Sequence, residues 1–203
     1  MTSAGRGYLL VKRLLDLVFI TVALPVVLPL GLILALLIRI DSPGPVLFAQ
    51  ERTGQHGRRF RMWKFRTMVA NAEELKKDLA HLNVLEPPDF KIPDDPRITR
   101  VGRFLRKTSL DELPQLLNLA QGTMTLVGPR PTSFAAHTYD LWHTSRLEVP
   151  PGITGLWQIT ARHTTGFDER LRLDHRYMGE MSLRTDLRIL LGTVTTIFGG
   201  RGA

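Results

Sequence analysis

The longest hydrophobic stretch of the chain is an uncharged run from Leu17 to Ile38. About 20 apolar residues in a helix cover the roughly 30 Å of hydrocarbon in a bilayer, so the run predicts a membrane helix. Pro25 and Pro29 lie near its middle, where each ring removes a backbone donor and presses on the preceding turn. We therefore expect the membrane helix to break between these two prolines.

Basic residues lie on both sides of this run. They are Arg6, Lys12 and Arg13 before it, and Arg39, Arg52, Arg58, Arg59, Arg61, Lys64 and Arg66 after it. Because Lys and Arg are retained on the cytoplasmic side, both ends are predicted to be cytoplasmic. We expect a re-entrant helix over about residues 12–40, within a monotopic membrane anchor of residues 1–40, and a cytoplasmic catalytic domain over 41–203. A kinked helix that spans the membrane is the alternative.

Period-two and helical patterns alternate in the remainder of the chain. Val46–Thr53 and Arg58–Met68 read as two strands around a glycine-bounded turn, and a turn at Pro150–Gly152 leads into a short apolar strand. Helical spacing covers residues 70–82, 97–107 and 167–178, and a final apolar stripe from Leu183 ends at Gly199-Gly200. The predicted fold class is α+β and mostly helical, with one β-hairpin and several amphipathic helices at the membrane interface.

Composition narrows the classes of partner. The 203 residues carry a net charge of +8, which suits an anionic partner. Beside a membrane anchor, phosphates and inner-membrane lipid headgroups are favoured, and no nucleic acid partner is expected. The chain has no Cys, which excludes disulfides and thiolate metal sites, and its six histidines show no close ligand spacing.

Asp111 and Glu112 form the most informative polar cluster, and two interpretations are open. Ser109 stands three residues before Glu112, which matches a capping box in which both acids simply favour a helix start. The pair also follows a basic stripe over residues 97–107. There, one carboxylate would bind a divalent metal while the other attacks an anionic group held by the arginines.

Two later segments carry candidate binding residues. Prolines on both sides of Arg130, in Gly128-Pro129-Arg130-Pro131, restrict the backbone and favour a bidentate grip on phosphate, although a surface arginine in a plain loop is the simpler interpretation. Trp157 follows the Pro150–Gly152 turn. Its ring belongs to the core, stacks on a base or lies at the membrane interface, and the sequence does not separate these alternatives.

Together these segments resemble the bacterial sugar transferase family, the monotopic polyprenyl-phosphate phosphoglycosyl transferases. The resemblance covers Lys12 to Gly202, and the chain looks like the minimal catalytic unit. The motifs that carry it, in order, are Lys12-Arg13 with Asp16, the proline-broken apolar run, Asp41-Ser42-Pro43-Gly44-Pro45, Lys64-Phe65-Arg66-Thr67-Met68, Asp95-Pro96-Arg97, Arg106 through Gln115, Gly128-Pro129-Arg130-Pro131, and Pro151-Gly152-Ile153-Thr154-Gly155-Leu156-Trp157-Gln158. One departure is Leu28, which precedes Pro29 where family members commonly carry Ser.

The resemblance implies a reaction at the cytoplasmic face of the bacterial inner membrane. A phosphosugar passes from a UDP-sugar to polyprenyl (undecaprenyl) phosphate, UMP is released, and a membrane-assembled glycan is begun. The resemblance makes Asp111 the nucleophile and Glu112, with Asp111, the holder of Mg²⁺. The same resemblance assigns substrate and phosphate binding to Arg106, Arg130, Lys64, Arg66 and Asp174. A homodimer is possible, and the sequence does not decide the oligomeric state.

Two other functions compete with this one. A glycosyl transferase or sugar-nucleotide hydrolase would use the same acids, and would release UDP or need no lipid acceptor. A basic membrane scaffold would use them only to cap a helix. The sequence does not identify the sugar, the glycan or the chain length of the acceptor.

Overall fold

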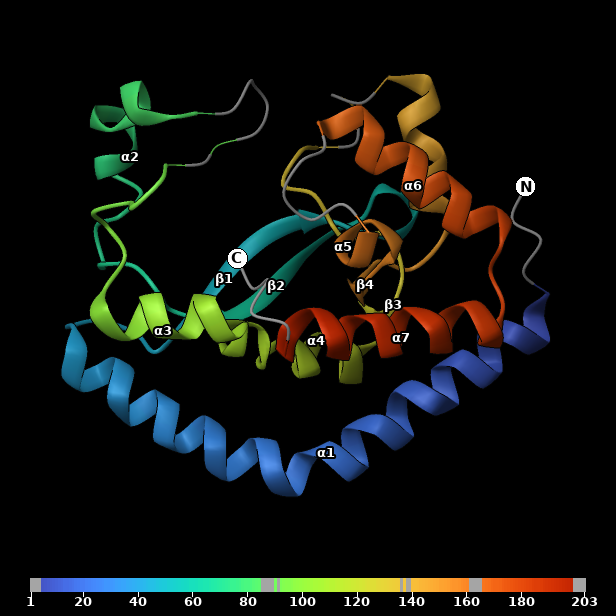
Figure 1. The fold of residues 1–203 in the computed structure, drawn as a ribbon, viewed down its shortest axis with the longest axis horizontal. Coiled ribbons are helices and arrows are strands. Elements are labelled where there is room, and N and C mark those ends of the chain that lie inside the picture. Colours follow the sequence, from blue (N-terminus) through green and yellow to red (C-terminus); the bar gives the residue numbers. More distant parts are fainter. Residues whose placement is uncertain are drawn as a thin grey trace.

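A computed structural model describes residues 5–84, 90, 92–135, 137, 140–160 and 166–198. Its longest element is helix α1 (Arg6–Asp41). Figure 1 shows α1 as a bow beneath the body of the protein, with both ends rising to the body and the middle hanging away from it. The rest of the described chain forms that body.

Helix α1 differs from the predicted anchor helix in two respects. It begins at Arg6 rather than near residue 12, and it continues through Pro25 and Pro29 without a break. Proline fixes φ at a helical value, so a long helix accommodates two of them by bending at the lost hydrogen bonds. Between Leu17 and Ile33 no residue of α1 is buried, and Val22, for example, is 72 % exposed.

The predicted β-hairpin is confirmed. Strand β1 (Leu47–Thr53) pairs antiparallel with β2 (Arg59–Phe65), so that Leu47 stands opposite Phe65. The short helix η1 (Gln55–Gly57) closes the turn. Strand β2 therefore ends at Phe65, before the predicted limit at Met68.

The parallel pairing of two further strands was not predicted from the sequence. The short apolar strand predicted after the turn at Pro150–Gly152 is limited to Gly152–Thr154, and the chain from Leu156 to Thr160 is helical instead. Strand β3 (Thr125–Val127) lies beside β4 (Gly152–Thr154). The amide of Gly128 donates to the Thr154 carbonyl at 2.8 Å. A Cβ atom on Gly152 would lie 2.1 Å from the Gly128 nitrogen, so only glycine permits this approach. The loop that carries Arg130 therefore leaves β3 at a fixed point.

Helices make up most of the body. In chain order they are α2 (Leu75–Asp78), η2 (Ala80–Leu82), α3 (Arg100–Thr108), η3 (Leu110–Glu112), α4 (Gln115–Gln121), η5 (Leu141–Glu148), α5 (Leu156–Thr160), α6 (Phe167–Gly179) and α7 (Leu183–Phe198). The last two confirm the predicted helices, while the one predicted over 70–82 is reduced to α2 and η2. The predicted end at Gly199-Gly200 lies outside the described residues.

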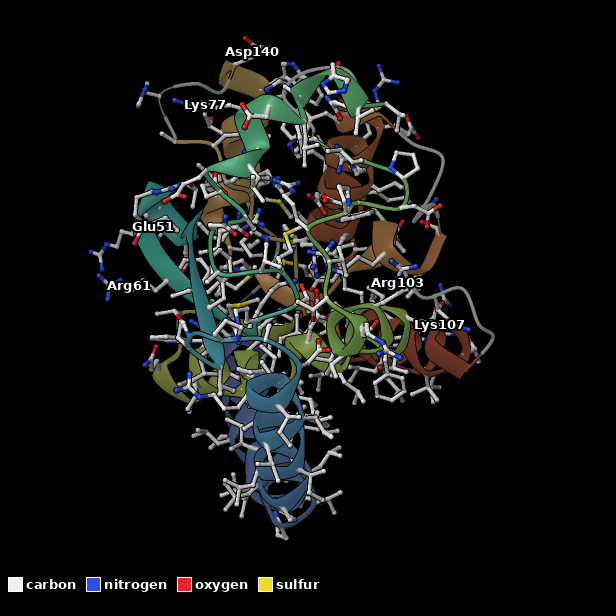
Figure 2. All side chains as sticks on the ribbon, turned by 90° about the vertical axis from the view of Figure 1, so that its left-hand side faces the viewer. Glu51, Arg61, Lys77, Arg103, Lys107 and Asp140 are labelled. Atoms are coloured by element: carbon white, nitrogen blue, oxygen red, sulfur yellow. The ribbon has the colours of Figure 1, made fainter. Side chains whose placement is uncertain are left out.

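Helices α3, α4 and α7 form a row on the side of the body that faces α1 (Figure 1). They expose large apolar side chains, including Phe104, Leu117, Leu187 and Leu191, which are 48–61 % exposed. Figure 2 shows α1 protruding below this row, with Arg103 and Lys107 of α3 at the level where it leaves the body. Apolar and basic groups therefore share one layer, as in helices that lie on a membrane surface.

The core is divided between the two ends of α1. One cluster packs Val127 and Val149 against Tyr177 and Ile189, near the N-terminal end of α1. The other cluster packs Leu34 and Ile38 of α1 against Phe65 and Leu105. Each end of the bow is thus attached to a different part of the body.

Candidate active site

The acidic pair lies in η3, the short turn between α3 and α4. The predicted capping box is wrong, because the Ser109 side chain caps neither helix. Ser109 is instead the C-cap of α3, with a left-handed backbone (φ 57°), and its amide donates to the Arg106 carbonyl. This turn sets Asp111 and Glu112 at the C-terminal end of the basic helix.

The fully buried side chain of Asn118 holds the hairpin against α4. Its amide oxygen accepts from the Trp63 N–H at 2.9 Å, and its amide nitrogen donates to the Arg61 carbonyl at 2.7 Å. Strand β2 is thereby fixed next to the acidic pair. Lys64, the next residue of that strand, reaches both acids.

Lys64, Asp111, Glu112 and Arg130 form one ion cluster. The Lys64 Nζ atom lies 3.0 Å from Glu112 Oε1 and 3.4 Å from Asp111 Oδ2. The Arg130 guanidinium contacts both oxygens of Glu112, one of them at 3.4 Å and the other more closely. The structure therefore brings together four of the residues that the resemblance had singled out, from β2, η3 and the loop after β3.

The two acids of this cluster differ in how tightly they are held. Burial would raise the pKa of the Glu112 carboxyl, but Arg130 and Lys64 outweigh it and hold that pKa well below its usual range. The contact from Lys64 to Asp111 is longer than the 2.7–2.9 Å typical of charge-assisted bonds. Glu112 is therefore the more tightly held carboxylate, and Asp111 is the less restrained one.

Arg106 supplies a third cation near the pair. Its Nε donates to the Thr67 hydroxyl at 2.9 Å, and α3 approaches this segment closely because a Cβ on Gly102 would lie 2.0 Å from the Thr67 carbonyl oxygen. Burial lowers the pKa of Arg106, and the charge of Asp111 acts in the opposite direction. Three cations thus surround two carboxylates, which favours an incoming anion.

Arg66 and Asp174 lie apart from this cluster. The Arg66 guanidinium donates to the carbonyls of Ser42, at 2.7 Å, and Pro43, so its described contacts hold the exit turn of α1. Asp174 is buried on α6 with its Oδ2 2.6 Å from Arg146, and burial raises its pKa to about 6 even though Arg146 lowers it. A phosphate contact for either residue stays a prediction.

Arg146 of η5 is a site residue that the sequence analysis missed. Its guanidinium pairs with Asp174 and donates to the backbone carbonyl of Arg130, which fixes the loop between the two prolines. Arg146 stands in no motif and follows an irregular stretch. No pattern in the sequence separates it from other arginines of this basic chain.

The donor set suits magnesium better than a transition metal. No three His, Asp or Glu side chains gather into a metal cage among the residues that the structure describes. Asp111 and Glu112 share Lys64 as a neighbour, so their oxygens lie on one side of η3. Mg²⁺ keeps several waters and binds through one or two carboxylates plus substrate phosphates, so a two-carboxylate site fits it.

Several known proteins are similar to this chain over nearly its whole length. The family model of bacterial sugar transferases matches residues 7–200. The galactosyl transferase CpsE of Streptococcus agalactiae is 44 % identical over 97 % of this chain and 44 % of its own length. The undecaprenyl-phosphate galactose phosphotransferase of Salmonella typhimurium is 40 % identical over 98 % of this chain and 43 % of its own length.

A shorter relative is also similar. The exopolysaccharide production protein ExoY of Rhizobium meliloti is 37 % identical over 95 % of this chain and 87 % of its own length. This chain therefore spans less than half of the first two relatives and most of the third. Since the family model covers nearly the whole sequence, the chain belongs to the bacterial sugar transferase family.

Proposed function

We propose that this chain transfers a phosphosugar from a UDP-sugar to polyprenyl phosphate and thereby starts a membrane-assembled glycan. The observation that carries the proposal is the cluster in which Asp111 and Glu112 lie among Lys64, Arg106 and Arg130. The Salmonella relative, an undecaprenyl-phosphate galactose phosphotransferase by name, supports this reaction class. The Streptococcus agalactiae relative is likewise named as a galactosyl transferase.

The chemistry proceeds in two displacements. A carboxylate oxygen of Asp111 attacks the phosphorus next to the sugar, the bond from that phosphorus to the bridging oxygen breaks, and UMP leaves with the electron pair. A phosphate oxygen of the polyprenyl carrier then attacks the aspartyl phosphosugar and restores the Asp111 carboxylate. Glu112 stays anchored throughout, while Lys64, Arg106 and Arg130 offset the charge of the phosphates.

Magnesium is part of the proposal. Glu112 and Asp111 would hold the ion, which when bound neutralises the pyrophosphate of the donor. The ion pairs from Arg130 and Lys64 to Glu112 orient that carboxylate before any ligand arrives. Asp111 keeps its less restrained position for attack.

We further propose that α1 enters and leaves the bilayer on the cytoplasmic face of the inner membrane. Lys12 near one end of α1 contacts Asp186, and Asp41 at the other end accepts from the Val101 amide, so both ends meet one body. A helix that spans the membrane would place its ends on opposite sides. The exposed apolar middle of α1 and the apolar and basic row of α3, α4 and α7 would then face lipid (Figures 1 and 2).

Nucleotide release tests the reaction. Purified protein with Mg²⁺, polyprenyl phosphate and a panel of UDP-sugars is expected to release UMP from at least one donor. Release of UDP would instead indicate glycosyl transfer. Without lipid, the proposed mechanism releases at most one UMP per protein, so continued UMP release without lipid would indicate a hydrolase. No release across the panel would favour a membrane scaffold.

The Asp111→Asn variant tests the nucleophile. Loss of the attacking oxygen is expected to reduce turnover by at least 1,000-fold, a barrier increase of about 4 kcal/mol, while membrane association is retained. Glu51→Gln is the control, because Glu51 is an exposed acid of β1 whose ion pairs lie on the hairpin surface. Turnover by Asp111→Asn equal to that of Glu51→Gln would contradict a covalent role for Asp111.

Single-cysteine labelling tests the membrane topology, since the chain has no native Cys. Gly5→Cys and Pro45→Cys place thiols at exposed positions beyond the two ends of α1. In sealed vesicles of one orientation, an impermeant reagent is expected to label both or neither. Opposite accessibility of the two thiols would show that α1 spans the membrane.

A further inference from the structure

Arg130 separates the acidic pair from a solvent-open pocket on its other side. The pocket is bounded by the loop after β3, by η5, and by α5 and α6. Its wall includes Arg52, Arg130, Arg146, Trp157, Arg170 and Asp174. Arg130 is among its lining residues, whereas Asp111 and Glu112 are not.

The pocket wall combines aromatic rings with positive charge. The Arg170 guanidinium lies 5.5 Å from the centre of the Trp157 ring and 5.7 Å from that of Phe167. Four arginines line the space against one carboxylate, Asp174, which is itself almost fully buried. A planar, polar ligand with a strongly negative group fits such a wall.

Arg130 makes the pocket and the acidic pair neighbours. Its guanidinium pairs with Glu112, while its backbone carbonyl accepts from Arg146, the partner of Asp174. A diphosphate that crosses Arg130 would place one phosphate at Asp111 and the other toward the pocket. In-line displacement directs the leaving group away from the nucleophile, which is also toward the pocket.

We propose that this pocket binds the uridine monophosphate half of the sugar nucleotide, with the uracil on Trp157 and its phosphate between Arg130 and the other arginines. This assignment rests on the proposed function. The ribose hydroxyls are donors, and the Asp174 carboxylate is an acceptor of the kind they require. The pocket therefore serves as the site that UMP occupies after the first displacement.

The base distinguishes this ligand from the sugar half of the donor. UMP and a sugar 1-phosphate each carry a phosphate monoester with a charge of about −2, so the arginines of the wall suit either phosphate. The base offers a flat face to Trp157, and a base stacked on an aromatic ring contributes about 1–3 kcal/mol.

Equilibrium dialysis with labelled UMP tests the assignment on the full chain in detergent, without a donor sugar or lipid. Trp157→Ala is expected to weaken UMP binding about tenfold, and Trp157→Phe less than threefold because a ring remains. Trp142→Ala is the matched control, since Trp142 is 42 % exposed and does not line the pocket. It is expected to leave binding within twofold.

A second variant keeps the test decisive if Trp157→Ala does not fold. Arg170→Gln removes one positive charge and is expected to weaken UMP binding about fivefold and to reduce its dependence on salt. Uridine, which lacks the phosphate, is expected to bind equally to this variant and to the parent chain. Equal UMP affinity for Arg170→Gln and the parent chain would overturn the assignment.

Galactose 1-phosphate separates the two halves of the donor. If Trp157→Ala weakened binding of galactose 1-phosphate and left UMP unchanged, the pocket would hold the sugar and the proposal would be wrong. The result is independent of turnover, because Asp111→Asn is expected to bind UMP within twofold of the parent chain. Binding of UMP that depends on Trp157 in a chain with no transferase activity would support the pocket and refute the reaction.

Discussion

Helix α1 contacts the body with two parts, an N-terminal arm that includes Lys12 and Asp16 and a C-terminal arm that includes Leu34 and Ile38. The first arm uses polar side chains and the second uses apolar ones. Lys12 and Asp16, four residues apart in the N-terminal arm, are 6 % and 2 % exposed. Leu34 and Ile38, also four residues apart in the C-terminal arm, are each 2 % exposed. One arm is therefore held by directional polar contacts, and the other mainly by packing.

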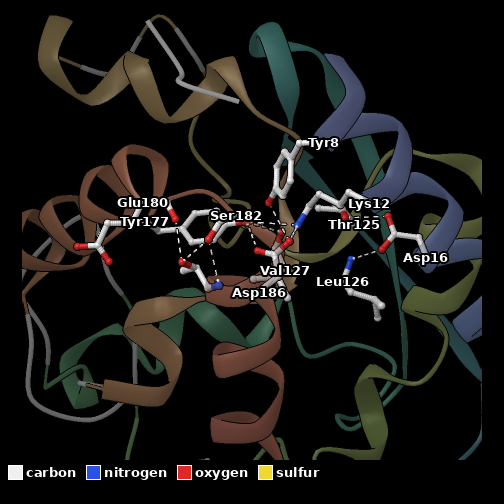
Figure 3. Close-up of polar contacts among 11 residues, drawn as sticks. Tyr8, Lys12, Asp16, Thr125, Leu126, Val127, Tyr177, Glu180, Ser182 and Asp186 are labelled. Carbon is white, nitrogen blue, oxygen red and sulfur yellow. Dashed lines mark hydrogen bonds and ion pairs between the residues drawn. The ribbon is translucent and has the colours of Figure 1, made fainter. Parts of the chain in front are cut away.

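Figure 3 shows the polar contacts of the N-terminal arm. The Lys12 Nζ atom lies 2.6 Å from an Asp186 carboxylate oxygen, and the same carboxylate accepts from the Tyr8 and Tyr177 hydroxyls, each at 2.8 Å. Asp16 accepts from the Thr125 hydroxyl at 2.7 Å and from the Leu126 amide at 3.0 Å. These contacts attach α1 to α7 and to β3.

The difference follows from what each arm must fix. Directional bonds specify one register along the helix, whereas apolar packing tolerates small shifts. The polar arm therefore determines where α1 meets β3, the strand that leads to Arg130, and the apolar arm needs only a complementary shape beside the hairpin.

Breaking the polar arm is expected to have the largest effect. Lys12→Met leaves the Asp186 charge buried without its cation, which typically costs about 3–5 kcal/mol. We expect a large fall in Tm, measured by thermal unfolding in detergent. Arg39→Met is the control, because Arg39 is an exposed cation of the same helix that donates to the Gly44 carbonyl, and it should cost about 1 kcal/mol.

A double variant sharpens this first prediction. Lys12→Met with Asp186→Asn removes both charges and leaves an acceptor for the two tyrosines. We expect it to recover more than half of the stability lost in Lys12→Met, since the uncompensated charge is gone. Equal Tm values for the single and double variants would show that packing of the Lys12 stem, not its charge, holds this arm.

The apolar arm is expected to give a smaller loss. Ile38→Ala removes a side chain that packs against Phe65 and Leu105, and such a cavity costs about 2 kcal/mol or somewhat more. Ile40→Ala is a closely matched control, because Ile40 lies two residues away and is 74 % exposed. The same Tm for both variants would mean that the C-terminal arm is not held by this cluster.

The contrast between the arms also explains what the sequence revealed. The run from Leu17 to Ile38 and the hairpin were predictable, because length and alternation are local signals. Lys12 and Asp186 are 174 positions apart, so no local pattern connects them. Strands β3 and β4 have three residues each, too few to show alternation, and they pair only because Gly128 and Gly152 let the backbones meet.

The candidate site was predictable in part for a similar reason. Asp111, Glu112 and Arg130 stand in recognisable motifs, and the structure unites them with Lys64. The local rule that assigned Ser109 to a capping box failed because Ser109 closes the preceding helix in a left-handed conformation. The four-residue pattern does not show which of two consecutive helices Ser109 belongs to.

The smallest effect on stability is expected from Asp16→Asn, which links the polar arm to the site. The amide oxygen of Asn still accepts from Leu126, but the charge-assisted bond from the Thr125 hydroxyl is weakened, at a cost of about 1 kcal/mol. Because β3 leads directly to the loop of Arg130, kcat/KM for UMP release should fall about fivefold. Thr125→Val, which removes only the hydroxyl, should reproduce most of the Tm change.

The two readouts separate anchoring from positioning. If Asp16 only attaches α1, Asp16→Asn lowers Tm and leaves kcat/KM unchanged. If Asp16 also sets the position of β3, kcat/KM falls at temperatures far below Tm, where the folded fraction is the same for both chains. We expect the second result, since the Leu126 amide that Asp16 binds is four residues from the guanidinium that holds Glu112.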